Sequence, residues 1–333
     1  MNKEYTLKEL SAISGVSMSS ISRYMADPGS VKPSTSKKIE YAVNKVPRHG
    51  NAHRSNLISI VVPDLSNEFF PLLLKGVESV AASHGFTLIV CSSHGDTLEE
   101  DRILNNLMGM GVAGIICVCA NTHGETMERI SRERQVPIIF LDRQPGFSGC
   151  FTITSDNDGG MYQGVKYLLS LGHRRILYLS GPQDVSTERE RYSGFLSAFE
   201  DEGLEFDDSD RIAANFDNLE AYSVVKGLIE RGEFDYTAIC ASNDLMAIGA
   251  YIALQEHRIP VPDQVSIIGF DDIPSSRLIH LTTIRQPFEE MGRLALLEFV
   301  NLRAYPLTPV KNIVLPTSIV IRDSCKAARV GSV

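Results

Sequence analysis

Charged, amide and aromatic side chains recur in this sequence directly after short apolar runs. Asp142 and Arg143 follow one such run, Asn243 follows a second and Asp271 a third. Carboxylate, amide and guanidinium groups donate and accept hydrogen bonds in the paired geometry that neighbouring hydroxyl groups require, and an aromatic ring can cover the apolar side of a sugar ring. Each residue alone could instead cap a helix or sit in a turn. Their recurrence indicates a site for a small polar ligand, with candidates Asn67, Phe69, Phe70, Ser92, Asp142, Arg143, Arg191, Phe216, Asn243 and Asp271.

The elements that must position these residues alternate along the chain from residue 57 onward. Apolar runs of strand length cover 58–63, 87–91, 114–119, 137–141, 176–180, 238–241 and 265–269. Helical stretches between them cover 71–84, 99–109, 159–171, 189–202, 219–231 and 244–256. Buried strands separated by helices form parallel sheets, and more than seven strands over this length predict two doubly wound lobes. Ligands bind such folds at the carboxyl ends of the strands, so we expect a cleft between the lobes.

The sequence offers little support for an enzyme. It contains no GxSxG motif, no P-loop and no GxGxxG after the first strand, and its histidines have no neighbouring nucleophile in a known pattern. Cys117 and Cys119 have the wrong spacing for a zinc knuckle. We therefore expect no catalytic residue, no metal and no cofactor.

The first 47 residues have a different organisation. Thr6 and Glu9 form a capping box that starts a helix, with Leu7, Leu10 and Ile13 on one face. Gly15 ends this helix in a left-handed conformation. Ser17 then caps a second helix that runs to about Met25 with Ile21 and Tyr24 inward, and a third runs from about 34 to 45 with Ile39, Ala42, Val43 and Val46 as its apolar stripe.

Two short helices joined by a tight glycine turn predict a helix-turn-helix, whose second helix enters the major groove of DNA. Met18, Ser19, Ser22 and Arg23 point away from its apolar face, and arginine can pair with guanine. A generic three-helix bundle is the alternative. Residues 1–56 carry nine Lys or Arg against four acids, a net charge of +5, which leaves −9 − 5 = −14 for the rest. A basic head on an acidic body is expected when only the head meets phosphate.

No apolar run approaches the ~20 residues of a membrane span, and the charged N-terminus does not resemble a secretion signal. We expect a cytoplasmic protein.

The segments Tyr5–Leu10, Ser14–Ser17 and Ile21–Arg23 resemble the head of the lactose/galactose repressor (LacI/GalR) family, and 61–67, 191–195, 241–244, 268–272 and 281–287 are similar to its core. The resemblance implies base contacts by Met18, Ser19 and Arg23, with Ser17, Ser20 and Ser22 nearer the backbone and Thr6 also among the DNA contacts. For the effector it implies Phe70, Asp142, Arg191, Phe216, Asn243 and Asp271, and it adds Gln286. We expect Arg191 and Asp271 to face each other across the cleft.

The match weakens in the linker. Family members have a hinge helix that inserts a leucine into the minor groove, whereas residues 47–56 contain no leucine and are about four residues short. Arg48 and Arg54 could still contact DNA, and a flexible basic tether is the alternative.

The resemblance implies a homodimeric repressor that reads a pseudopalindromic operator under the control of a sugar-like effector. It implies a head at 1–47, a linker at 48–57, an N-terminal lobe of 58–155 plus 286–316 and a C-terminal lobe of 156–285 plus 317–333, with chain crossings near Thr154, Arg285 and Pro316. The alternatives are a sugar sensor that has lost operator-specific binding through its short hinge, or a transport binding protein, against which the missing export signal argues.

Overall fold

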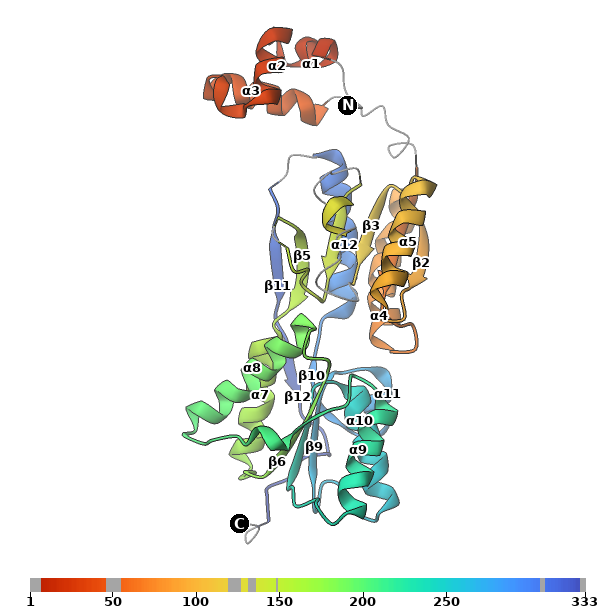
Figure 1. The fold of residues 1–333 in the computed structure, drawn as a ribbon, viewed down its shortest axis with the longest axis vertical. Coiled ribbons are helices and arrows are strands. Elements are labelled where there is room, and N and C mark those ends of the chain that lie inside the picture. Colours follow the sequence, from red (N-terminus) through yellow and green to blue (C-terminus); the bar gives the residue numbers. More distant parts are fainter. Residues whose placement is uncertain are drawn as a thin grey trace.

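The computed structural model describes residues 7–45, 55–118, 127–130, 136–147, 149–305 and 309–329. Three helices form the head, and two six-stranded sheets form the two lobes of the body (Figure 1). The predicted α/β class with a helical head is confirmed. Within the described residues no helix is long and apolar enough to span a bilayer.

The head packs three helices around one small core. They are α1 (Leu7–Ser14), α2 (Met18–Ala26) and α3 (Pro33–Lys45), with a 3-10 turn η1 (Pro28–Ser30) before α3. The buried side chains are Leu10, Ile21, Ile39, Ala42 and Val43. Gly15 has a φ of +66° between α1 and α2, as its role as a left-handed cap requires.

One expectation for the head was wrong. Ile13, which the helical spacing placed on the apolar face, is 39% exposed. It lies in the last turn of the eight-residue α1, one residue before the helix ends, while the core that buries Leu10 is centred one turn earlier. Val46, the predicted end of the α3 stripe, and the linker through Arg54 lie outside the described residues.

Sheet A forms the first lobe and is entirely parallel. Its strands in spatial order are β11 (Asn312–Leu315), β5 (Phe151–Ser155), β4 (Ile138–Leu141), β3 (Gly114–Cys117), β1 (Leu57–Val62) and β2 (Thr87–Ser92). The helices described over their full length in this lobe are α4 (Phe69–Ala81) with the short η3 (Ala82–His84), α5 (Thr97–Met110) and α12 (Phe288–Ala304), and residues 127–130 are also helical. One apolar core lies between the sheet and α4 with α12, and a second lies under α5 on the other face.

Sheet B forms the second lobe in the same way, except that its edge strand β12 is antiparallel. Its strands in spatial order are β12 (Ser318–Val320), β10 (Thr282–Arg285), β9 (Ser266–Asp271), β8 (Ala238–Ala241), β6 (Ile176–Ser180) and β7 (Arg211–Ala213). Its helices are α7 (Asn157–Ser170), α8 (Ser186–Asp201), α9 (Asn218–Glu230), α10 (Asp244–Glu256) and α11 (Pro274–Leu278), with the turn η4 (Asp208–Asp210). One core lies under α7 and α8, and the other under α9 and α10.

The chain passes between the two sheets three times. It leaves sheet A after β5, returns from β10 to α12, and leaves again between β11 and β12. In Figure 1 the late elements α12 and β11 therefore stand beside the early strands of the first lobe.

Helices α4 and α12 of the first lobe pack closely against each other. A Cβ on Gly292 of α12 would lie 2.1 Å from the carbonyl oxygen of Leu73 in α4, so the two helices approach each other at a distance that only glycine allows.

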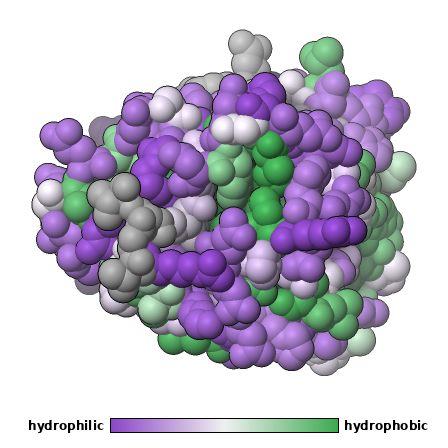
Figure 2. Space-filling view, turned by 90° about the horizontal axis from the view of Figure 1, so that it is seen from below, coloured by the Kyte–Doolittle hydropathy of each residue, from purple (hydrophilic) through white to green (hydrophobic). Residues whose placement is uncertain are grey.

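The end of the second lobe, seen from below, presents mainly hydrophilic side chains with small apolar patches between them (Figure 2).

Candidate functional site

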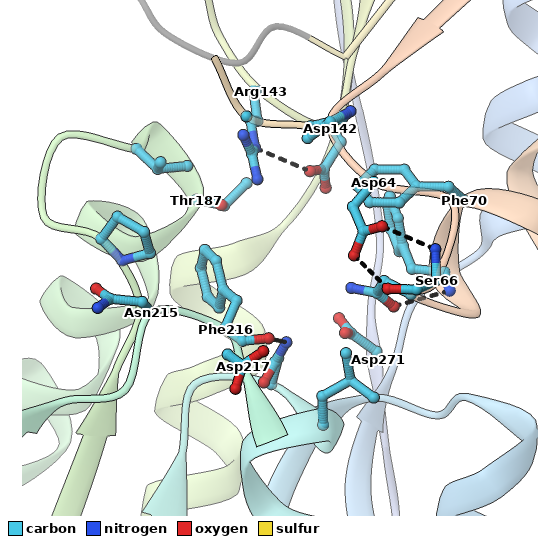
Figure 3. A pocket seen from close by; sticks show the side chains of 18 of the residues that line it. Asp64, Ser66, Phe70, Asp142, Arg143, Thr187, Asn215, Phe216, Asp217 and Asp271 are labelled. Carbon is cyan, nitrogen blue, oxygen red and sulfur yellow. Dashed lines mark hydrogen bonds and ion pairs between the residues drawn. The ribbon is translucent and has the colours of Figure 1, made fainter. Parts of the chain in front are cut away.

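A cavity of about 630 Å³ lies between the lobes, where the carboxyl ends of both sheets meet. Its walls come from loops that follow β1, β2 and β4 in the first lobe and β6, β7, β8 and β9 in the second (Figure 3). The lining residues are Pro63, Asp64, Ser66, Asn67, Phe69, Phe70, His94, Gly95, Asp142, Arg143, Pro182, Asp184, Val185, Thr187, Arg191, Asn215, Phe216, Asp217, Asn218, Asn243, Leu245 and Asp271.

The first lobe supplies a buried carboxylate whose hydrogen bonding is incomplete. Asp142 follows β4 with a φ of +62° and is 6% exposed. Its Oδ2 lies 4.0 Å from Nε of Arg143, while its Oδ1 has no hydrogen-bond partner among the described residues. Burial raises the pKa of Asp142, and the positive charges of Arg191 and Arg143 partly oppose this. A buried acceptor without a donor is costly, so this oxygen is suited to receive a hydrogen from a ligand.

The second lobe contributes the buried guanidinium group of Arg191, which is fixed by two hydrogen bonds and an aromatic ring. Arg191 donates through Nε to Oδ1 of Asn157 at 2.9 Å and through Nη1 to the carbonyl oxygen of Ser242 at 2.7 Å. Its guanidinium carbon lies 3.9 Å from the ring centre of Phe270. These contacts fix the direction in which Arg191 can meet a ligand, because a planar guanidinium donates only in its own plane.

Asp271, at the end of β9, pairs with this arginine at 3.5 Å. Its Oδ1 also accepts a hydrogen bond of 2.6 Å from Nε2 of Gln286. Burial, together with the charge of Asp142, raises its pKa to about 7, and Arg191 and Gln286 only partly oppose this. The site thus combines one buried cation with two buried carboxyl groups.

The expectation that Arg191 and Asp271 face each other across the cleft was wrong. Both belong to the second lobe, since α8 begins and β9 ends at the same edge of sheet B. Asp142 lines the same cavity from the first lobe, and the charge of Arg191 lowers its pKa.

Aromatic rings cover the remaining walls. Phe69 and Phe70 start α4 and pack edge to face with their ring centres 4.8 Å apart. Phe216 lies on the opposite side, on the second lobe (Figure 3), and the amide of Asn243 donates to its carbonyl oxygen at 3.3 Å. Apolar faces on two sides with polar groups between them suit a ring that carries hydroxyl groups.

Most residues predicted for this site line the cavity, but two do not. Ser92 donates to the carbonyl oxygen of Pro63 at 3.3 Å, and Gln286 lies behind Asp271. The sequence interpretation missed the loop Pro182–Thr187, which follows the predicted strand at 176–180. The polar residues of this loop, Asp184 and Thr187 among them, are the signal that could have revealed it.

Hydrogen bonds already join the lobes at both sides of the cavity. Gln144 donates through its backbone to Oγ of Ser186 at 2.9 Å and through Nε2 to Glu190 at 3.1 Å. The backbone amide of Ser275 donates to Glu68 at 3.0 Å. Hydrogen bonds of this kind can break and form again when a cleft between two lobes opens and closes.

The head presents its predicted DNA contacts on one surface. Ser17, Met18, Ser19, Ser22 and Arg23 are exposed, and Ser20 is half-buried. Ser17 caps α2 by accepting from the backbone amide of Ser20 at 3.3 Å, and Arg23 donates to Oγ of Ser20 at 3.4 Å. Thr6, Arg48 and Arg54 lie outside the described residues.

Comparison with known proteins identifies the family. Residues 165–325 match a family described as a periplasmic binding protein-like domain. The chain is 30% identical to the ribose operon repressor of Escherichia coli strain K12, over 87% of this chain and 91% of that protein. It is 32% identical to the transcriptional regulator DegA of Bacillus subtilis strain 168, over 96% and 97% of the two chains. The chain belongs to the LacI family of transcriptional regulators. A solved LacI-family regulator from Enterococcus faecium with bound ribose matches 82% of this chain and all of its own, with a TM-score of 0.75 and 27% identity.

This LacI-family protein is therefore a transcriptional regulator, not an enzyme, and its two-lobed body is the periplasmic-binding-protein-like core of the family.

Proposed function

We propose that this regulator binds a pseudopalindromic operator as a homodimer and that a small sugar in the cleft controls its affinity for that operator. The observation that carries the proposal is the pair of buried polar walls, Asp142 on one lobe and Arg191 with Asp271 on the other, which one polyol can join. A ligand that contacts both lobes favours the arrangement in which both contacts form.

Ribose is the first ligand to test. The solved regulator with bound ribose and the ribose operon repressor both support a monosaccharide of this size. The unpartnered oxygen of Asp142 calls for a hydrogen donor, which a sugar hydroxyl supplies and a phosphate oxygen does not.

The proposed domain boundaries are those predicted from the sequence. We propose that residues 1–47 read DNA and 48–57 connect the head to the core, with 58–155 plus 286–316 and 156–285 plus 317–333 as the lobes. The composition of sheets A and B supports this division of the core. In the head, the exposed surface of α2 that carries Met18, Ser19 and Arg23 supports base contacts by these three residues.

The test is a titration of purified protein against DNA from upstream of its own gene, with competitor DNA, repeated across a panel of sugars that begins with ribose. We expect selective binding that one sugar shifts, with a coupling of about 1–3 kcal/mol in either direction. Arg191→Ala is expected to remove the sugar response. Arg189→Ala is the matched control, because Arg189 lies on the same helix but is exposed.

The alternative function, a sugar sensor without operator-specific binding, makes a different prediction. It requires a dimer that binds a sugar but shows no preference for the upstream DNA at low salt. The short linker is the observation that favours it. If Arg23→Ala binds the operator as well as the unchanged protein, the assignment of the recognition helix fails.

A further inference from the structure

A buried carboxyl group of the second lobe lies close to the cleft without lining it. Glu188, in the first turn of α8, is 0% exposed and is not among the lining residues of the cavity. It precedes Arg191 by one turn of the same helix, so the two side chains are neighbours. Replacing a buried ion pair by apolar side chains is often neutral or stabilising, so stability alone does not explain a glutamate at this position.

Four hydrogen-bond donors converge on the carboxyl group of Glu188. Its Oε2 accepts from Oγ of Ser242 at 2.5 Å and from the backbone amide of Gly181 at 2.8 Å. Its Oε1 accepts from the hydroxyl of Tyr178 at 3.2 Å and from Nη2 of Arg211 at 3.2 Å. Tyr178 and Gly181 lie in or directly after β6, Arg211 begins β7, and Ser242 follows β8. One side chain therefore joins three neighbouring strands of sheet B.

The contact with Ser242 leads to the buried cation of the cleft. The carbonyl oxygen of Ser242 accepts the hydrogen bond of 2.7 Å from Nη1 of Arg191. Glu188 thus holds the side chain of the residue whose backbone fixes this end of the guanidinium group. The other contact, from Nε of Arg191 to Asn157, fixes only the near end. A guanidinium group held at Nε alone can rotate out of the plane in which it must meet a ligand.

The contact with Gly181 leads to an aromatic wall of the cleft. A Cβ on Gly181 would lie 2.3 Å from Cζ of Phe216, so the ring of Phe216 rests directly on the backbone of this glycine. Phe216 lines the cavity (Figure 3). Because Glu188 accepts from the backbone amide of Gly181, it also fixes the surface on which this ring lies.

A charged carboxylate suits these four contacts better than an amide does. Burial raises the pKa of Glu188, while the hydrogen bonds from Ser242 and Gly181 and the charges of Arg211 and Arg191 lower it. Every partner of the group is a donor, and a carboxylate only accepts. Glutamine has one accepting oxygen and would place an NH₂ group where donors already point, so Glu188→Gln changes these contacts with almost no change in volume.

We propose that Glu188 is a positioning residue for the effector. It fixes Arg191 through Ser242 and Phe216 through Gly181, and so sets the arrangement in which the second lobe meets the ligand. Glu188 itself touches no ligand. The proposal rests on the proposed function, because it takes the cleft as the effector site, but the positions of Arg191 and Phe216 can be measured without a ligand.

Crystal structures of the unliganded full-length variants are the first test. In Glu188→Gln we expect Nη1 of Arg191 to lie more than about 3.5 Å from the carbonyl oxygen of Ser242, and the ring of Phe216 to move. Tyr178→Phe is the matched control, because it removes a donor to the same carboxyl group from a residue that supports no cleft side chain. Both side chains should keep their positions in this control.

Calorimetric titration with ribose is the second test, with thermal unfolding of each variant alongside. Glu188→Gln should weaken ribose binding about tenfold, whereas Tyr178→Phe should bind as the unchanged protein does, even where both variants lose thermal stability. A purely structural role predicts instead that affinity follows stability in both variants. Ser242→Ala removes one contact only, so it should displace Arg191 and leave Phe216 in place. This milder variant decides the question if Glu188→Gln does not fold.

The outcomes separate this proposal from the proposed function. The role of Glu188 is overturned if Arg191 and Phe216 keep their positions in Glu188→Gln, or if this variant binds ribose as tightly as Tyr178→Phe. If the unchanged protein binds no ribose, the choice of ligand fails, and the crystal structures alone decide whether Glu188 positions the two side chains.

Discussion

Sugar affinity should depend on pH mainly through the carboxyl group of Asp271. The pKa of Asp271 is about 7 because the group is buried, and Arg191 and Gln286 only partly offset this burial. Sugar hydroxyls that donate to this carboxyl favour its charged form, so the bound state should have a lower pKa than the free state. Binding should then release a proton, and affinity should rise as the pH rises through about 7.

The size of the effect follows from the fraction of protein in the charged form. With a pKa of about 7, about one carboxyl in eleven is charged at about pH 6 and about ten in eleven at about pH 8. The apparent Kd should therefore fall about tenfold over this interval. The neighbouring carboxyls Asp142 and Asp244 are also buried and have raised pKa values, and they contribute further protons wherever their own titration overlaps this range.

Calorimetry between about pH 6 and about pH 8 in buffers of different ionisation enthalpy measures both the affinity and the number of protons released. Asp271→Asn should bind sugar more weakly and lose most of the pH dependence. Asp184→Asn, an exposed residue at the rim of the cavity, should keep it. A Kd that is constant over this range, or a slope that survives in Asp271→Asn, would refute the reasoning.

Three further predictions concern stability. Asp142→Asn should weaken sugar binding about tenfold and leave the midpoint temperature of thermal unfolding unchanged or higher. The substitution removes a buried charge at a backbone conformation that Asn tolerates, so a lowered midpoint temperature would contradict this prediction. Ile21→Ala should destabilise the head by about 2–5 kcal/mol and abolish operator binding without affecting sugar binding, because Ile21 is buried in the core of the head. Met18 is 53% exposed, so Met18→Ala should leave the fold intact in a circular-dichroism melt. Gly292→Ala should destabilise the core by about 1–3 kcal/mol in denaturant titrations. Gly109→Ala should not, because no atom lies within 4 Å of the methyl group added to that helix. Equal effects of the two variants would show that the contact between α4 and α12 is not tight.

The sequence predicts most of the regular structure because the central strands of both sheets are continuous apolar runs. Ile58 to Val62 and Ile176 to Ser180 are buried along their length, so their pattern is unambiguous. The edge strand β2 was predicted, whereas the other edge strands were not, because they are short and partly exposed: β7 has three residues, and Val314 of β11 is 60% exposed. The interior strands β5 and β10 were also not predicted, because threonine interrupts their apolar residues although both are largely buried. Helix α4 begins two residues before the predicted start because Asn67 accepts from the backbone amide of Phe69, which allows the turn to start ahead of Pro71.

The site was predictable in composition but not in geometry. Residues at the carboxyl ends of predicted strands, such as Asp142 and Asn243, line the cavity because parallel strands bring these ends together. The pairing of Arg191 with Asp271 within one lobe depends on the side-by-side position of α8 and β9, which are about 80 residues apart in sequence. Spacing along the chain does not specify such a contact, nor does it reveal that Gln286 reaches Asp271 from behind.

The return of the chain to the first lobe sets an order of events during synthesis. The core of that lobe needs Phe288, Met291, Leu296 and Phe299 from α12, and its sheet gains the edge strand β11 only at residues 312–315. On the ribosome, residues 57–155 must therefore emerge without part of their apolar core while the whole second lobe is made. Incomplete cores and open strand edges promote aggregation. A premature stop that removes only the last tenth of this polypeptide should thus compromise its first lobe, and chaperones that shield nascent chains should matter more for this protein than its length suggests.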